Sequence, residues 1–155
     1  MTTLYSLITE EVLNMMKSFQ EPNLTTLTDF YELTMANGYF ANGLGDTICY
    51  FDMFFRKVPD KGGFAIMAGV EQLVEYLKNL RFCDEDIEFL HQKHIFSREF
   101  LDYLRNFKFS CDVWAVPEGT PIFPGEPIVT VRGPAIQAQF IETMVLLCIN
   151  HQSLI

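Results

Sequence analysis

The sequence is short of positive charge: its 155 residues carry 11 Lys and Arg against 20 Asp and Glu, a formal net charge of -9 at pH 7. An acidic chain of this kind lacks the basic face that broad binding to nucleic acid or to anionic membranes requires. Any phosphate-bearing ligand would therefore need a local cation, and the candidates are few: Arg56, Lys57, Lys61, Arg81 and Arg132.

Cysteine patterns are also absent. The four cysteines form no C-x-x-C pair, and no histidine stands at a ligand spacing from any of them. This argues against a zinc site and against a disulfide framework, so we expect free thiols in a reducing compartment, the cytoplasm. The first 20 residues lack the basic start of a signal peptide. Residues 135–155 could span a bilayer by length, but six polar residues interrupt them and predict a buried helix.

Hydrophobic residues make up 49% of the chain and aromatic residues 14%, which predicts a folded domain rather than disorder. Apolar periodicity and turn residues predict a mixed helix and strand order without internal repeats. The expected helices are 4–19, 28–42, 69–80, one from 84, one from 97, and a single helix over 135–155. The expected strands are 47–55, with both faces covered, then 64–67, 113–116, 122–123 and 128–131.

Three segments carry candidate chemistry. The first is T-D-F-Y-E-L-T-M at 28–35, where Thr28 is predicted to cap a helix and Asp29 suits its positive end. The second runs from Phe54 to Val70 and contains F-F-R-K-V-P followed by two glycines. The third is E-G-T-P-I-F-P-G-E-P-I at 118–128, followed by Gly133-Pro134 and a helix with Gln139, Glu142 and Thr143. Of these, Gln139 and Glu142 are expected to relieve a buried helix rather than to catalyse.

The third segment alone also fits a biotinyl or lipoyl carrier domain, which uses similar glycine and proline turns. A carrier needs a lysine to modify, however, and none occurs between Phe109 and Ile155. The three segments in this order, over residues 23–155, resemble the N-terminal part of the nicotinate phosphoribosyltransferase family.

The resemblance implies an α/β fold. Residues 23–134 would form an α+β N-terminal domain with a small barrel-sandwich-like β unit, and 135–155 would lead into an irregular α/β barrel that the chain lacks. Residues 1–22 lie outside the resemblance. The implied reaction joins nicotinate to phosphoribosyl pyrophosphate with ATP hydrolysis, in NAD salvage. Magnesium ions and ATP are the implied cofactors, and the implied assembly is a homodimer with shared sites, without nucleic-acid or membrane partners.

The resemblance also assigns residues. Tyr31 would stack on the nicotinate ring, Arg56 would hold a phosphate, and Thr34 would contact substrate. Asp29 would either face substrate or orient the helix, because a carboxylate repels anionic nicotinate. No catalytic residue or metal ligand is assigned; the phosphorylated histidine of the family has no match in His91, His94 or His151. Since the helix at 135–155 ends uncapped, we expect a partial copy of the enzyme without transferase activity of its own.

Two alternatives remain from the sequence. A nicotinamide-specific relative shares the Asp29 and Tyr31 pattern but matches residues 54–69 less well. A non-catalytic interaction domain, which would associate through an exposed apolar helix at 140–149, belongs to a different functional class.

Overall fold

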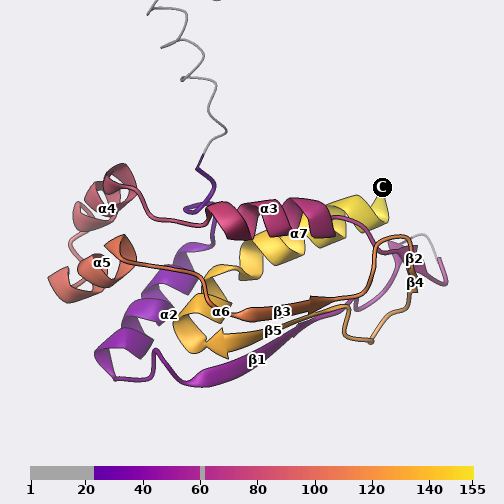
Figure 1. The fold of residues 1–155 in the computed structure, drawn as a ribbon, viewed down its shortest axis with the longest axis horizontal. Helices are drawn as coiled ribbons and strands as arrows, with labels where there is room; N and C mark the ends of the chain where they lie inside the picture. Colours follow the sequence, from indigo (N-terminus) through magenta and orange to yellow (C-terminus); the bar gives the residue numbers. More distant parts are fainter. Residues whose placement is uncertain (1–22, 60–61) are drawn as a thin grey trace, which may run out of the picture.

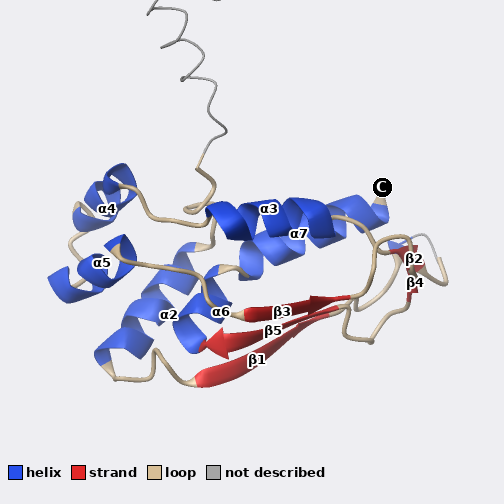
Figure 2. Ribbon diagram, viewed as in Figure 1, coloured by secondary structure: helices blue, strands red, loops and turns tan. Residues whose placement is uncertain are grey.

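The computed structural model describes residues 23–59 and 62–155. The helix expected over residues 4–19 therefore lies outside the described residues. The described elements mix helices and strands, as expected from the sequence (Figures 1 and 2). In chain order they are α2 (Phe30–Ala41), β1 (Ile48–Met53), β2 (Ala65–Ile66), α3 (Val70–Asn79), α4 (Asp84–His91), α5 (Arg98–Arg105), β3 (Asp112–Ala115), β4 (Pro121–Ile122), β5 (Val129–Pro134), α6 (Ala135–Phe140) and α7 (Glu142–Leu154).

The main sheet has the strand order β1-β5-β3, and both pairings are antiparallel. Tyr50 stands opposite Arg132, which in turn stands opposite Asp112. Strands β2 and β4 form a separate two-stranded sheet. Strands β3 and β5 thus share a sheet with β1, and the three helices α3, α4 and α5 lie between β1 and β3 in the chain.

Among the described residues, helices cover one face of the main sheet. Helix α6 packs on β1 and β5, α2 lies beside α6, and α3 lies along α7 (Figure 1). On the opposite face Tyr50 is 66% exposed and Trp114 is 54% exposed. The prediction that strand 47–55 is covered on both faces is therefore wrong. It rested on apolar residues at both odd and even positions of the strand, but the described helices lie on one side of the sheet.

The C-terminal segment is two helices rather than the single one predicted. Helix α6 ends at Phe140, and α7 begins at Glu142 after Ile141, whose φ and ψ are -97° and -1°. No glycine or proline marks this break. Most of residues 140–149 are buried, with Leu146 and Leu147 exposed, so the expected exposed apolar helix is also wrong. None of the described helices combines the length and the apolarity needed to cross a membrane.

An aromatic cluster fixes α2 against the rest of the domain. Phe40 of α2 lies 5.6 Å from Phe100 and 5.4 Å from Tyr103, ring centre to ring centre. Phe140 of α6 joins the same core through Phe107, at 5.6 Å. Edge-on and tilted contacts of this kind add about 0.5–1.5 kcal/mol each beyond area burial. The start of α2, at its other end, has one such contact, Phe30 with Phe96 at 6.1 Å, and polar contacts in addition.

Candidate functional site

Helix α2 presents Tyr31 on the surface. Its buried side is formed by Glu32, Leu33 and Ala36, whereas Tyr31 lies in the first turn and is 44% exposed. The residue before the helix is Asp29, which occupies the N-cap position with φ -67° and ψ 138°. The prediction that Thr28 caps the helix is therefore wrong by one residue, and the Thr28 hydroxyl bonds to the Glu32 side chain instead.

Acidic groups surround the Tyr31 hydroxyl. Partial burial, a hydrogen bond to the Glu142 carboxylate, and the negative charges of Glu142, Glu32 and Asp29 raise the pKa of Tyr31 to about 12. The phenol is thus neutral at physiological pH, beside the carboxylate of Glu142. The motif around Tyr31 predicts ring stacking, and this arrangement leaves the ring rather than the hydroxyl proton available to a ligand.

Glu32 is fully buried, at 0% exposure. It accepts hydrogen bonds from the hydroxyls of Thr28 and of Thr143, the latter at 2.7 Å. Burial raises the pKa of the Glu32 carboxyl group, and the nearby charges of Glu142 and Asp29 raise it further. The two hydrogen bonds from Thr28 and Thr143 lower this pKa and so oppose the shift. Tyr76 of α3 adds a second buried polar group, whose hydroxyl has no partner among the described residues.

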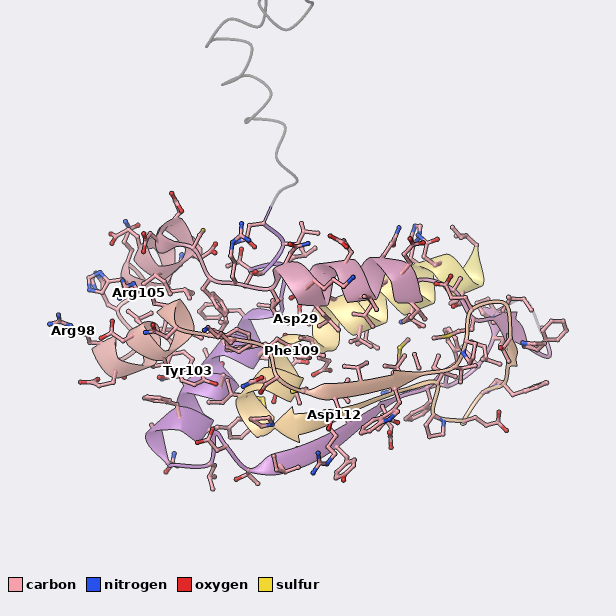
Figure 3. All side chains as sticks on the ribbon, viewed as in Figure 1. Asp29, Arg98, Tyr103, Arg105, Phe109 and Asp112 are labelled. Atoms are coloured by element: carbon pink, nitrogen blue, oxygen red, sulfur yellow. The ribbon has the colours of Figure 1, made fainter. Side chains whose placement is uncertain are left out.

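Asp29 and Thr34 also serve the local structure. The backbone N–H of Asp29 donates to the Thr143 hydroxyl at 3.2 Å, and the Asp29 side chain is exposed and caps no backbone group (Figure 3). The Thr34 hydroxyl donates to the backbone carbonyl of Tyr31 at 3.0 Å. Asp29, Tyr31 and Thr34 therefore share one turn of helix, and Thr143 of α7 is next to it.

Arg56 lies in a different part of the fold. It follows β1 as an exposed residue, where the Phe55 carbonyl accepts from the Gly125 N–H at 2.8 Å. Its guanidinium forms no ion pair with another described residue, unlike Arg105 and Arg132. No hydrogen bond links Arg56 to the Tyr31 turn within the described residues, and the two residues come from different elements, the segment after β1 and the first turn of α2.

A small cavity lies between the sheet and the α6–α7 junction. Its volume is about 130 Å³, and its polar lining consists of Asp52 of β1 and Glu142 of α7. Ligand pockets usually measure about 300–1,000 Å³. The cavity is therefore smaller than a complete ligand site, although the carboxylate that holds Tyr31 also lines it.

Comparisons with known proteins agree with this architecture. Residues 26–150 match the family model for the nicotinate phosphoribosyltransferase N-terminal domain. The chain belongs to the nicotinate phosphoribosyltransferase family.

Relatives of this transferase family are similar over most of the chain. A nicotinate phosphoribosyltransferase of Mycobacterium tuberculosis is 44% identical over 128 residues, which cover 83% of this chain and 27% of the relative. That of Bacillus subtilis is 36% identical over 137 residues, covering 88% and 28%. The crystal structure of human nicotinic acid phosphoribosyltransferase superposes with a TM-score of 0.77 at 37% identity, covering 83% and 26%. The chain thus spans about a quarter of the length of these relatives.

A more distant structure shares the fold alone. Nicotinate-nucleotide pyrophosphorylase from Pyrococcus furiosus superposes with a TM-score of 0.58 at 18% identity and covers 84% of this chain. Its likeness supports the arrangement of helices and sheet and carries no argument about activity.

Magnesium, which the family resemblance implies, does not fit the described residues of this transferase domain. No group of three or more His, Cys, Asp or Glu side chains in the described ranges could hold a metal ion. Of the carboxylates around Tyr31, that of Glu32 is buried and bonds to the hydroxyls of Thr28 and Thr143. No step of the reaction is therefore assigned to a metal held by these residues.

Sequence reasoning missed the contribution of α7 to the transferase domain. Glu142 was expected only to relieve a buried helix and Thr143 was given no role, yet Thr143 bonds to Asp29 and Glu32, and Glu142 lies near Tyr31. Both residues lie in the first turn of α7, whose start no glycine, proline or capping residue marks in the sequence. The sequence offered no sign of which other helix start they would meet.

Proposed function

We propose that this chain supplies the pyridine-facing part of a nicotinate phosphoribosyltransferase site, in a protein of the cytoplasm. In the proposed reaction the pyridine nitrogen of nicotinate attacks C1 of phosphoribosyl pyrophosphate, the bond from C1 to the pyrophosphate oxygen breaks, and nicotinate mononucleotide and pyrophosphate are formed. ATP hydrolysis and magnesium belong to the proposed reaction as well, with their ligands outside the described residues.

The observation that carries the proposal is the presentation of Tyr31. The residue is 44% exposed, and its hydroxyl lies near the carboxylate of Glu142, which helps to raise the phenol pKa. A flat, electron-poor pyridine ring gains burial and offset stacking from such a surface. Since the acidic surroundings would repel the nicotinate carboxylate, we propose that this carboxylate points away from Glu142 and toward a cation from another part of the enzyme.

Arg56 is the proposed phosphate contact. A guanidinium binds phosphate oxygens through two parallel hydrogen bonds, and this one has no ion-pair partner among the described residues. As the family resemblance implies, we propose that Arg56 and Tyr31 serve sites shared between two copies of the enzyme. The cavity volume of about 130 Å³ supports a site that needs further walls.

A hybrid enzyme tests this function. Residues 26–150 replace the matching segment of the Bacillus subtilis relative, and nicotinate mononucleotide is measured with nicotinate and, separately, with nicotinamide as substrate. We expect turnover with nicotinate, and we expect the Tyr31→Phe variant to keep this turnover. The Tyr31→Ala variant should lose at least about tenfold in kcat/KM, equivalent to one lost stacking contact.

Arg56→Ala should raise the KM for phosphoribosyl pyrophosphate, whereas Arg98→Ala on the surface of α5 serves as the matched control. Full activity of both Tyr31→Ala and Arg56→Ala would overturn the assignment, and a preference for nicotinamide would favour the nicotinamide-specific relative. The chain of 155 residues by itself should form no nicotinate mononucleotide. An interaction domain that associates through residues 140–149 has no support, since that helix face is mostly buried.

A further inference from the structure

The first turn of α2 is closed by a residue from another helix. In an ordinary capping box, a glutamate at the third helical position accepts from the backbone N–H of the N-cap residue. Glu32 occupies the third position, but the Asp29 N–H donates to the Thr143 hydroxyl at 3.2 Å. That hydroxyl in turn donates to Glu32 Oε1 at 2.7 Å. Thr143 of α7 thus stands between the two partners of the box.

We propose that Glu32 and Thr143 are positioning residues for nicotinate: they fasten the first turn of α2 to the first turn of α7 and so fix the direction of the Tyr31 ring. This inference rests on the proposed function and adds two residues to its site. Neither residue is expected to touch the ligand, since Glu32 is fully buried and the Thr143 hydroxyl is occupied as donor and as acceptor.

The position of Tyr31 makes this connection necessary. Tyr31 lies between Asp29 and Glu32 in the chain, so both sides of its backbone are tied to Thr143. Its hydroxyl lies near the carboxylate of Glu142, the neighbour of Thr143 on α7. A side chain exposed to this degree has little packing to hold it. An aromatic ring that is held before the ligand arrives loses less side-chain entropy on binding.

Within the described residues, the Glu32 carboxyl group has hydroxyl partners and no cationic partner. Burial is the main cause that raises its pKa, the charges of Glu142 and Asp29 add to this, and no Lys or Arg among the described residues bonds to it. The buried hydroxyl of Tyr76 faces the same interior from α3, and burial followed by the charge of Glu32 raises its pKa as well. Glutamine should therefore replace Glu32 well, because hydroxyls can both donate to and accept from an amide.

Amide hydrogen exchange on the chain of 155 residues tests whether Thr143 holds the first turn of α2. Thr143→Val keeps the shape of the side chain and removes the hydroxyl, whereas Thr143→Ser keeps the hydroxyl. We expect exchange at the amides of residues 29–32 to become about tenfold faster in Thr143→Val, as for the loss of one net hydrogen bond. Exchange should stay near the parent rate in Thr143→Ser, and exchange in α5 should be unchanged in both. Unchanged exchange at residues 29–32 in Thr143→Val would overturn the proposal.

Kinetics of the hybrid transferase test the link to the ligand. Thr143→Val and Glu32→Ala should raise the KM for nicotinate about tenfold at unchanged KM for phosphoribosyl pyrophosphate, and Glu32→Gln should restore it. Equal rises in both KM values would overturn the positioning role. Failure of Glu32→Gln to restore the parent KM for nicotinate would also overturn it. If Tyr31→Ala leaves nicotinate use intact while the exchange result holds, the stacking assignment fails and the contact between α2 and α7 stands as purely structural.

Discussion

Replacing Gly69 by alanine should be among the most damaging small changes in this domain. Gly69 precedes α3 with φ at 96°, a left-handed conformation that costs other residues about 1–2 kcal/mol. A Cβ atom there would lie 2.4 Å from the backbone carbonyl oxygen of Cys148 in α7. Because backbone atoms of a packed helix cannot move aside easily, overpacking adds about 1–3 kcal/mol. The free energy of unfolding should therefore fall by about 2–5 kcal/mol.

Urea unfolding followed by circular dichroism measures this loss. With a slope of about 2 kcal/mol per M, the midpoint of Gly69→Ala should fall by about 1–2.5 M. Gly38→Ala is the matched control, since Gly38 lies inside α2, has no positive φ, and has open space where a Cβ atom would stand. Alanine favours a helix interior over glycine by about 0.8–1 kcal/mol, so this midpoint should rise. A Gly69→Ala midpoint at or above that of the parent would refute the reasoning.

Three further predictions concern single side chains. Glu118 accepts from the backbone N–H of Val70 at 2.6 Å and so caps α3 from a distant loop; Glu118→Ala should lower the unfolding free energy by about 0.5–2 kcal/mol in the same assay, and Glu126→Ala should not. Burial raises the pKa of Cys111 to about 11, so native Cys111 should react slowly with iodoacetamide at pH 8 and quickly in urea, as mass spectrometry would show. The folded state raises the pKa of Glu32. The stability that protonation of Glu32 contributes is therefore fully present below the ordinary glutamate pKa and is lost as pH rises through the raised value. The urea midpoint should decline over this pH range in the parent and should not decline in Glu32→Gln.

The sequence was sufficient for the local structure near the candidate site. Apolar periodicity located α2 and α3, and the change of period after Phe109 located the short strands, because these signals depend on neighbours in the chain. The motif around Tyr31 also pointed to the family that the comparisons support. Its assigned roles for Tyr31 and Arg56 remain predictions for the experiments above.

Tertiary structure alone decided which helix starts meet and which sheet face is covered. The pairing of Thr143 with Asp29 and Glu32 joins residues 114 and 111 positions apart, a distance over which periodicity carries no information. The break at Ile141 likewise has no local breaker, and it follows from the packing of α6 on the sheet and of α7 along α3. Local propensity fixes an element, whereas its partners depend on how all the apolar faces are buried together.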